Sequence, residues 1–313
     1  MARFGISPGR IRTLDGFESF IYEFVKDGRA YILRIGHSLR RTPELIHGEV
    51  DWINYLAAGG AGVASAVLSE NGKLVELIAD GRGGQFLATA FVKAKGGTVW
   101  QTDRWDERLF EQYGRLLGRI HHLSKTYQPA TPAWKRPSWD DPMMLFTELY
   151  APEEQTAVLS RYRDLLTYLH SLPQDSKSYG LIHQDAHGGN FFVDEEYNLT
   201  LFDFDDCVYS HFVNDIAIAL FYAVTNHPEP EKQLTELWSP FWQGYSGEND
   251  LDTGWLQEIP HFMKLREIDL YAVLLDTFGP GSSGNEWIDT FRHGRRTRIE
   301  NNIPYLDINW EAL

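Results

Sequence analysis

The segment spanning residues 181–206 constrains the fold more tightly than any other part of the sequence. It contains two short apolar runs, Phe191–Val193 and Leu199–Phe202, separated by the polar stretch Asp194–Asn198. Short apolar runs on either side of a polar turn predict two paired strands. The residues just before and just after these runs are polar. We therefore expect a polar loop, a small hairpin and a second polar turn, in that order along the chain.

The polar residues around this hairpin have the spacing His-x-Asp-x4-Asn, followed thirteen residues later by a further Asp. They are His183, Asp185, Asn190 and Asp203. Phosphoryl transfer to a hydroxyl group needs positioning, metal ions on the phosphates and an acceptor for the hydroxyl proton. Asp185 is the candidate acceptor, and the oxygens of Asn190 and Asp203 are the hard ligands that Mg²⁺ prefers. These residues at these spacings favour phosphoryl transfer assisted by Mg²⁺.

The residues of this loop resemble a known family. His183-Gln184-Asp185-Ala186-His187-Gly188-Gly189-Asn190 is similar to the His-x-Asp-x-His-x-x-Asn motif of the aminoglycoside phosphotransferase and choline kinase superfamily. Asn214-Asp215-Ile216-Ala217 resembles a segment that follows in the same family. The resemblance covers about residues 12–225 and is strongest over 181–217. It implies a protein-kinase-like fold.

The resemblance also implies roles for the motif residues. Asp185 is the catalytic base, with His183 and Asp215 as supports of its loop. Asn190 and Asp203 bind Mg²⁺.

Two further residues of this region admit two interpretations each. Asp205 either contacts a second metal ion or belongs, with Asp206, to a solvated acidic turn. His187 either has a functional role in the motif or merely caps the loop or packs. We keep Asp205 as a candidate metal ligand.

The first part of the chain, residues 1–92, is expected to form a β-rich nucleotide-binding lobe. An Asp-Gly pair between Phe20–Val25 and Ala30–Ile35 predicts a hairpin, because these turn residues tolerate a positive φ. An Asn-Gly pair between Ala66–Ser69 and Leu74–Ile78 predicts a second hairpin. A further strand is predicted at Phe86 to Phe91.

One helix is predicted between these hairpins. Thr42 can cap it, Pro43 suits its first turn and Gly59-Gly60 ends it. From residue 93 to 313 the chain is expected to form a mainly helical catalytic and substrate-binding lobe, since apolar residues recur at 3.6-residue spacing from Leu109 to Leu123. The predicted class is α+β, a bilobal protein-kinase-like fold with a small antiparallel sheet and one helix in the first lobe.

The expected phosphate contacts lie in the first lobe. Leu14–Phe20 stands where a kinase has its phosphate-covering loop, and it holds one glycine, Gly16, with Ser19 as a further phosphate contact. Arg34 stands where protein kinases have a lysine, and its planar fork suits phosphate. Glu49 on the predicted helix is its expected partner. The alternative for both is a surface ion pair of little energetic value.

The expected adenine contacts lie in the last predicted strand of this lobe. Phe86 to Val92 resembles the strand and hinge that take the base in this superfamily. Backbone groups from Ala90 to Val92 are the candidates.

The composition limits the partners. The net charge of −15 argues against nucleic acid and anionic membranes, and it is compatible with a cationic small-molecule acceptor. No apolar run is long enough for a spanning helix, and the single cysteine, Cys207, rules out an intramolecular disulfide framework. These features favour a cytoplasmic setting. Aromatic and acidic residues of the C-terminal third either bind an ammonium group or fill the core: Trp238, Trp242, Tyr245, Trp255, Glu267, Asp269, Tyr271 and Trp287.

The predicted function is ATP-dependent phosphorylation of a hydroxyl on a small molecule, such as an amino alcohol, a homoserine-like compound, an aminoglycoside or a sugar. One alternative is a bacterial-type protein Ser/Thr kinase on the same fold. Only eleven residues separate Asp203 from Asn214, which leaves little room for a peptide-docking segment. The other is a nucleotide-binding module without catalysis, and the filled positions Asp185, Asn190 and Asp203 argue against it.

Overall fold

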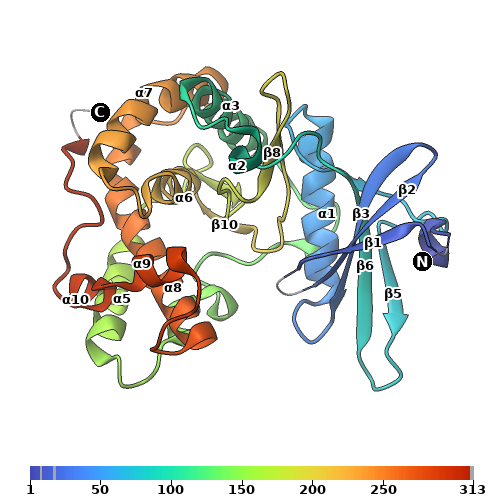
Figure 1. The fold of residues 1–313 in the computed structure, drawn as a ribbon, viewed down its shortest axis with the longest axis horizontal. Coiled ribbons are helices and arrows are strands. Elements are labelled where there is room, and N and C mark those ends of the chain that lie inside the picture. The colour runs from blue at the N-terminus through green and yellow to red at the C-terminus, as the bar shows by residue number, and fades with distance from the viewer. Residues whose placement is uncertain (8, 17–18, 311–313) are drawn as a thin grey trace. The chain divides into compact units, whose positions relative to one another are not determined.

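The chain divides into two units, each assembled from three separate stretches of sequence (Figure 1). This computed structural model describes residues 1–7, 9–16 and 19–310. Unit 1 contains Met1–Arg104, Thr126–Arg136 and Gly189–Cys207. Unit 2 contains the remaining stretches, Trp105–Lys125, Pro137–Gly188 and Val208–Leu313.

The boundary between the units differs from the predicted division at residue 92. The hairpin region 189–207 belongs to unit 1 although it lies far along the chain. The physical reason is backbone pairing, because Val63 bridges Leu201, and Gly97 bridges Val193. The predicted α+β class is confirmed, with an antiparallel sheet and a helix in one unit and mainly helices in the other.

Unit 1 is built on a six-stranded antiparallel sheet with the order β1-β2-β3-β6-β4, in which β5 also pairs with β6. Its elements are β1 (Ile11–Leu14), β2 (Phe20–Lys26), β3 (Arg29–His37), α1 (Pro43–Ala58), β4 (Ala66–Val67), β5 (Val75–Ala79), β6 (Gln85–Val92), α2 (Val99–Thr102), β8 (Phe191–Val193) and β9 (Leu199–Leu201), with short 3-10 helices at Ala2–Phe4 and Pro132–Trp134.

The sheet of unit 1 is buried on both faces. On one face Ile46 and Val50 of α1 pack against Leu87 of β6 and its neighbours. On the other face Phe4 and its neighbours cover Ala90 of β6. Alternate residues of β6 thus serve two cores, as the side-chain period of a strand requires.

The first predicted hairpin and the predicted helix are confirmed. Lys26 pairs with Arg29, and the turn residues Asp27 and Gly28 have φ values of 50° and 76°. Thr42 caps α1, because its side chain accepts the Leu45 N–H at 3.3 Å. The last predicted strand of this lobe is also present as β6.

The second predicted hairpin is wrong. β4 and β5 do not pair with each other, since Val67 pairs with Ala90 and Val75 with Thr89, both in β6. The Asn-Gly turn between the two strands does form. Within it, the side chains of Ser69 and Asn71 donate hydrogen bonds to the Glu76 carboxylate. A longer partner strand competes with a short local ladder for the same backbone groups.

Unit 2 is mainly helical, with one two-stranded antiparallel sheet of β7 and β10. Its elements are α3 (Glu107–Ser124), α4 (Phe146–Tyr150), α5 (Thr156–Leu169), β7 (Tyr179–Ile182), β10 (Val208–His211), α6 (Phe212–Val224), α7 (Pro230–Glu248), α8 (Ile259–Phe278), α9 (Glu286–Arg292) and α10 (Arg295–Glu300), with 3-10 helices at Pro142–Met144 and Thr253–Glu258.

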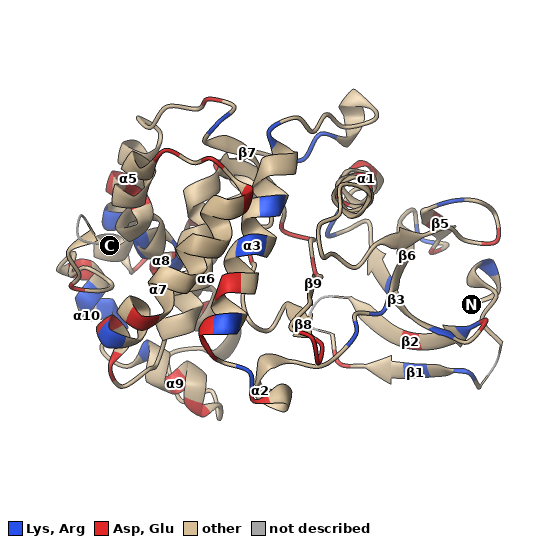
Figure 2. Ribbon diagram, turned by 90° about the horizontal axis from the view of Figure 1, so that it is seen from above, with Lys and Arg blue, Asp and Glu red and all other residues tan. Residues whose placement is uncertain are grey.

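The core of unit 2 surrounds α6. This helix has Asp215 as its one charged residue and is mostly tan in Figure 2, and nearly all of it is buried. The predicted stripe of α3 is confirmed, with Leu109, Tyr113 and Leu117 buried. α3 packs closely on α7, where Gly114 and Gly244 allow the backbones to approach, since a Cβ on either would meet a carbonyl oxygen at 1.9 Å. Within residues 1–7, 9–16 and 19–310, no helix combines the length and apolar character needed to cross a membrane.

Candidate active site

The loop that follows β7 in unit 2 presents Asp185. The Asp215 carboxylate, in the first turn of α6, accepts the backbone N–H groups of His183 at 2.9 Å and Gln184 at 2.8 Å. The ring Nδ1 of His183 accepts the Asp185 N–H at 3.2 Å. Gln184 has a φ of 72°, a conformation that side chains rarely adopt unless their surroundings hold it. Asp215 supplies that support by binding both loop amides.

A second layer holds Asp215 in turn. His121 of α3 lies with Nε2 3.2 Å from the Asp215 carboxylate, and its Nδ1 is 2.8 Å from the Tyr245 hydroxyl. His121, Asp215 and Tyr245 are all buried. The sequence prediction named Asp215 but gave His121 no role, because the two are 94 residues apart and no local spacing links them.

Asp185 itself is paired on both carboxylate oxygens within unit 2. Arg266 of α8 donates to Oδ1, and His187 Nε2 lies 3.4 Å from Oδ2. Burial alone would raise the pKa of the Asp185 carboxyl, but Arg266 and His187 outweigh it and hold that pKa below its ordinary value. Asp185 is therefore ionised at neutral pH. The sequence prediction missed Arg266, which has no motif around it.

Asn190 and Asp203 lie in unit 1, on the two sides of the β8–β9 hairpin. The Asn190 carbonyl accepts the Phe202 N–H at 2.9 Å, which brings the start of one strand next to the end of the other. Asp203 is exposed and has a φ of 65°. Asp tolerates this left-handed conformation better than most residues. One carboxylate and one neutral amide thus lie in neighbouring backbone positions, as the sequence predicts.

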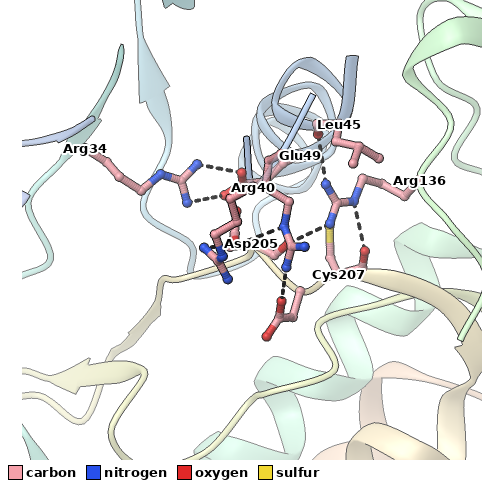
Figure 3. A network of polar contacts seen from close by, with 9 residues as sticks. Arg34, Arg40, Leu45, Glu49, Arg136, Asp205 and Cys207 are labelled. Atoms are coloured by element: carbon pink, nitrogen blue, oxygen red, sulfur yellow. Dashed lines mark hydrogen bonds and ion pairs between the residues drawn. The ribbon is translucent and has the colours of Figure 1, made fainter. Parts of the chain in front are cut away.

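Asp205 lies two residues further on, among arginines (Figure 3). Its carboxylate contacts Arg40 at 2.7 Å and Arg41 Nε at 3.2 Å, and Arg41 Nη2 also binds Asp206 at 2.6 Å. Burial alone would raise the pKa of Asp205, but Arg34, Arg41 and Arg40 lower it. The carboxylate of Asp205 is thus already neutralised by guanidinium groups, and its role as a metal ligand stays a prediction.

Arg136 ties this turn to α1. Its guanidinium donates to the backbone carbonyls of Cys207 at 2.9 Å, Asp205 at 2.6 Å and Leu45 at 2.9 Å (Figure 3). Arg136 is only 3% exposed, so these bonds are shielded from water. Cys207 is fully buried, and burial raises the pKa of its thiol to about 12. Cys207 is thus a small residue of the core.

Arg34 and Glu49 form the predicted pair. The two guanidinium nitrogens of Arg34 donate to the two carboxylate oxygens of Glu49, at 2.8 and 2.5 Å (Figure 3). Glu49 is fully buried, so this is not an exposed surface pair. Burial would lower the pKa of Arg34, but Glu49 and Asp205 raise it above its ordinary value. The pair fixes the guanidinium of β3 against α1.

A pocket of unit 1 adjoins this pair. Its lining includes Ser19, Arg34, Arg41 and Thr89. Thr89 faces Arg34 across the β3–β6 ladder, and its buried hydroxyl has no hydrogen-bond partner among the residues that the structure describes. A buried polar group without a partner is uncommon and calls for an explanation.

The predicted phosphate-covering loop is only partly described, because residues 17–18 lie outside the described part of the chain. Gly16 is required by close approach, since a Cβ there would lie 2.3 Å from the Ser19 carbonyl oxygen. The Ser19 hydroxyl lies beside Gly36 of β3, 3.6 Å from where a Cβ on that glycine would be. Ser19 and Arg34 thus line the same pocket, and Gly16 packs closely against Ser19.

Ala90 and Val92 lie in β6, as predicted. Ala90 is fully buried in the middle of the sheet. The Val92 N–H donates to the Ser65 carbonyl at 2.9 Å, and the Lys93 N–H donates to the Ala30 carbonyl at 3.1 Å. These two backbone N–H groups are therefore already used in hydrogen bonds to neighbouring segments of unit 1. The adenine contacts at Ala90 and Val92 stay a prediction.

Most of the C-terminal candidates are core residues. Trp238, Tyr245, Glu267, Asp269 and Tyr271 are buried. The Glu267 carboxylate pairs with Lys264 and with Arg295 at 2.7 Å rather than facing an open site. Trp287 is different: it is 39% exposed and stacks on Tyr222, with ring centroids 6.3 Å apart.

The sequence matches a family model and a known protein. A model of the phosphotransferase enzyme family, designated APH, matches residues 10–251. The chain is 40% identical to amicoumacin kinase of Bacillus subtilis (strain 168) over 316 aligned positions, which cover 100% of this chain and 93% of that protein.

Solved structures are similar as well. Amicoumacin kinase hAmiN, solved in complex with AMP-PNP, Ca²⁺ and Ami, matches with a TM-score of 0.92 and 36% identity over 99% of this chain and 93% of that one. A microcompartment-associated aminopropanol kinase matches with a TM-score of 0.74 at 22% identity, over 96% of this chain and 95% of that one. The second likeness concerns the fold alone.

Proposed function

The chain belongs to the phosphotransferase enzyme family, and we propose that it transfers the γ-phosphate of ATP, with Mg²⁺, to a hydroxyl group of a small molecule, with Asp185 accepting the proton. The family match and the 40% identical relative confirm the predicted resemblance and the predicted enzyme class, a kinase with an alcohol group as acceptor. The predicted protein-kinase-like fold is also confirmed.

The observation that carries the proposal is the support of the Asp185 loop. Asp215 binds the two amides that precede Asp185, and His183 binds the Asp185 amide itself. Such fixed geometry is what a proton acceptor or a hydroxyl-orienting group requires. A weakly basic carboxylate suffices, because the loose transition state of phosphoryl transfer makes little demand on base strength.

The proposed metal ligands fit a hard divalent cation. Asp203 offers an exposed carboxylate and Asn190 a neutral amide oxygen, held together by the Phe202–Asn190 backbone bond. Mg²⁺ is commonly bound by one or two such groups together with phosphate oxygens. When bound, the ion neutralises charge on the phosphates. The similar amicoumacin kinase was solved with Ca²⁺ and AMP-PNP, another hard cation and an ATP analogue.

The proposed nucleotide contacts fit phosphate. Arg34 is held by Glu49 with its guanidinium at the pocket that Ser19 also lines. The unpartnered Thr89 hydroxyl in the same pocket would gain a hydrogen bond from a bound ligand. We assign Ser19, Gly16 and Arg34 to the phosphates and the end of β6 to the base.

The proposed acceptor is a hydroxylated antibiotic or metabolite similar to amicoumacin, because two relatives, at 40% and 36% identity, are amicoumacin kinases. The protein-kinase alternative has little support, since residues 202–207 alone connect β9 to β10.

The test is turnover of ATP with Mg²⁺ against a panel of amicoumacin, aminoglycosides, amino alcohols, homoserine, threonine, sugars and a generic protein substrate. We expect a small-molecule acceptor to give the highest kcat/KM and chelation of the metal to abolish transfer. Transfer only to the protein substrate, or transfer that persists in the chelator, would contradict the proposal.

A further inference from the structure

Arg266 stands beside the proposed proton acceptor and has no role in the reaction derived so far. It comes from α8, and Asp185 lies 81 residues earlier in the chain. The side chain is 14% exposed, so part of it reaches solvent. The inference below concerns what this residue selects, and it rests on the proposed function of Asp185.

Arg266 is held in one orientation by Tyr222 of α6. The Tyr222 hydroxyl accepts from Nε at 3.2 Å and from Nη2 at 2.8 Å. The guanidinium also lies over the Tyr222 ring, 5.1 Å from its centroid. Nη2 further donates to Asp185 Oδ1. Within the described part of the chain, Nη1 donates no hydrogen bond.

The charges around this group favour an oxygen acceptor. The positive charge of Arg266 compensates the negative charge of Asp185, and His187 Nε2 lies 3.4 Å from the other carboxylate oxygen, Oδ2. Asp269, one turn along α8, is buried and accepts hydrogen bonds from Thr147, and its negative charge also attracts the guanidinium of Arg266. An ammonium group next to the reacting hydroxyl would therefore meet a guanidinium, whereas a carbonyl or carboxylate oxygen would meet a donor.

Aromatic side chains surround this group. The rings of His187 and Tyr222 lie 4.7 Å apart and are tilted by 48° to each other, and Trp287 stacks on Tyr222 at an interplanar angle of 18°. Flat amide or carboxylate groups suit the planar edge of the guanidinium.

We propose that Arg266 is a specificity-determining residue, which binds a carbonyl or carboxylate oxygen of the acceptor close to the hydroxyl that receives the phosphate. The acceptor class is then a hydroxy amide or hydroxy acid, rather than a simple amino alcohol. Arg266 also positions Asp185 by donating a hydrogen bond to Oδ1.

The test uses three acceptors that share one hydroxyl environment: L-threonine, L-threoninamide and 1-aminopropan-2-ol, in which the carboxyl group is replaced by hydrogen. Steady-state kcat and KM are measured for the wild type, Arg266→Gln and Arg266→Lys with ATP and Mg²⁺. Thermal stabilisation by each compound is measured in parallel. Arg296→Gln is the matched control, because Arg296 is an exposed arginine that pairs with Glu300 on α10.

We expect the wild type to favour threonine and threoninamide over the amino alcohol by about 10- to 100-fold in kcat/KM, the range for a hydrogen bond to a charged group. Arg266→Gln should remove the preference mainly by raising the acceptor KM, with the KM for ATP unchanged. Arg266→Lys should retain more preference for the carboxylate than for the amide. Arg296→Gln should behave as the wild type.

Two outcomes overturn the inference and leave the proposed function standing. One is a wild type that prefers the amino alcohol, and the other is an Arg266→Gln variant with an unchanged preference. A wild type that neither phosphorylates nor is stabilised by threonine or threoninamide overturns it as well. Failure of the proposed function has a different signature, which is the absence of transfer to every acceptor of the larger panel.

Discussion

At the scale of single residues, the neighbours of Asp185, the proposed proton acceptor, make its carboxylate a weak base. Arg266 and His187 contact both oxygens of Asp185 and lower the pKa of its carboxyl. A strong base would need the opposite surroundings, namely burial without a cationic partner. The arrangement fits a reaction in which orientation matters more than basicity, and phosphoryl transfer through a loose transition state is such a reaction.

Thr89 gives a prediction at the same scale. Its buried hydroxyl has no partner in the described residues and lies in the pocket that Arg34 lines. Thr89→Val should raise the free energy of unfolding of the ligand-free protein by about 1 kcal/mol, because an unsatisfied buried group is removed. It should also weaken ATP binding about 3- to 10-fold, because a ligand contact is lost. Urea denaturation and nucleotide titration measure the two effects.

Thr225→Val is the matched control for this experiment. The Thr225 hydroxyl donates to the Phe221 carbonyl at 2.6 Å, so its removal should lower the free energy of unfolding. If Thr89→Val also lowered that free energy and left ATP binding unchanged, the Thr89 hydroxyl would have a structural role instead.

At the scale of elements, Arg136 links helix α1 to the turn that carries Asp203 and Asp205. A lysine has one nitrogen and cannot reach the three carbonyls that the guanidinium binds. Arg136→Lys should therefore lower the free energy of unfolding by about 2–4 kcal/mol, because buried carbonyls lose their donors. It should also raise the Mg²⁺ concentration needed for half-maximal rate, because the turn after Asp203 is no longer held.

Denaturation and metal titration of Arg136→Lys are compared with those of Arg161→Lys, since Arg161 is exposed and its Nε donates to the Glu300 carbonyl at 3.0 Å. A variant at 136 with wild-type stability and a wild-type metal requirement would show that the link between α1 and the turn is not needed.

Two buried groups of unit 2, His211 and Asp269, give opposing pH effects. Burial lowers the pKa of His211, at the end of β10, to about 4, and burial raises the pKa of Asp269 in α8 to about 6. As pH falls from about 6.5 to 4, the unfolded chain protonates His211 first, which lowers the free energy of unfolding. As pH falls from about 6 to 4, the folded chain protonates Asp269 first, which raises the free energy of unfolding. Each effect is worth roughly 3 kcal/mol.

The prediction is that Asp269→Asn makes the free energy of unfolding fall more steeply between pH 6 and about 4 than in the wild type, because the compensating proton uptake is removed. His211→Gln should have the reverse effect. Urea denaturation at several pH values measures both variants. Parallel curves for the wild type and Asp269→Asn would show that Asp269 does not titrate in this range.

At the scale of the whole molecule, the sequence predicted what depends on local patterns. The Asp27-Gly28 hairpin, the Thr42 cap of α1 and the strands around Phe191 and Leu199 all follow from neighbouring residues. The same local reasoning failed between Ala66 and Ile78, because β6 offers both segments a longer partner than they offer each other.

The surroundings of the motif residues could not be predicted in this way. Arg266 meets Asp185 across 81 residues, and Arg41 meets Asp205 across 164. Such pairs arise from the packing of whole elements and leave no spacing in the sequence. The division of the chain into units has the same origin. One stretch of unit 2 ends at Gly188, and the last stretch of unit 1 begins at Gly189, in the middle of the motif. The proposed proton acceptor and the proposed metal ligands therefore belong to different units.

The central claim, that Asp185 accepts or orients the proton in a kinase reaction, is tested most directly by phosphorus NMR of phosphate transfer from ATP to the best acceptor of the panel. Asp185→Asn keeps the shape of the side chain and removes its charge. The account predicts a kcat about 10²- to 10⁴-fold below that of the wild type, with the KM for ATP unchanged and Arg296→Gln unaffected. A kcat for Asp185→Asn within about threefold of the wild type would contradict it, because general-base contributions are much larger than that.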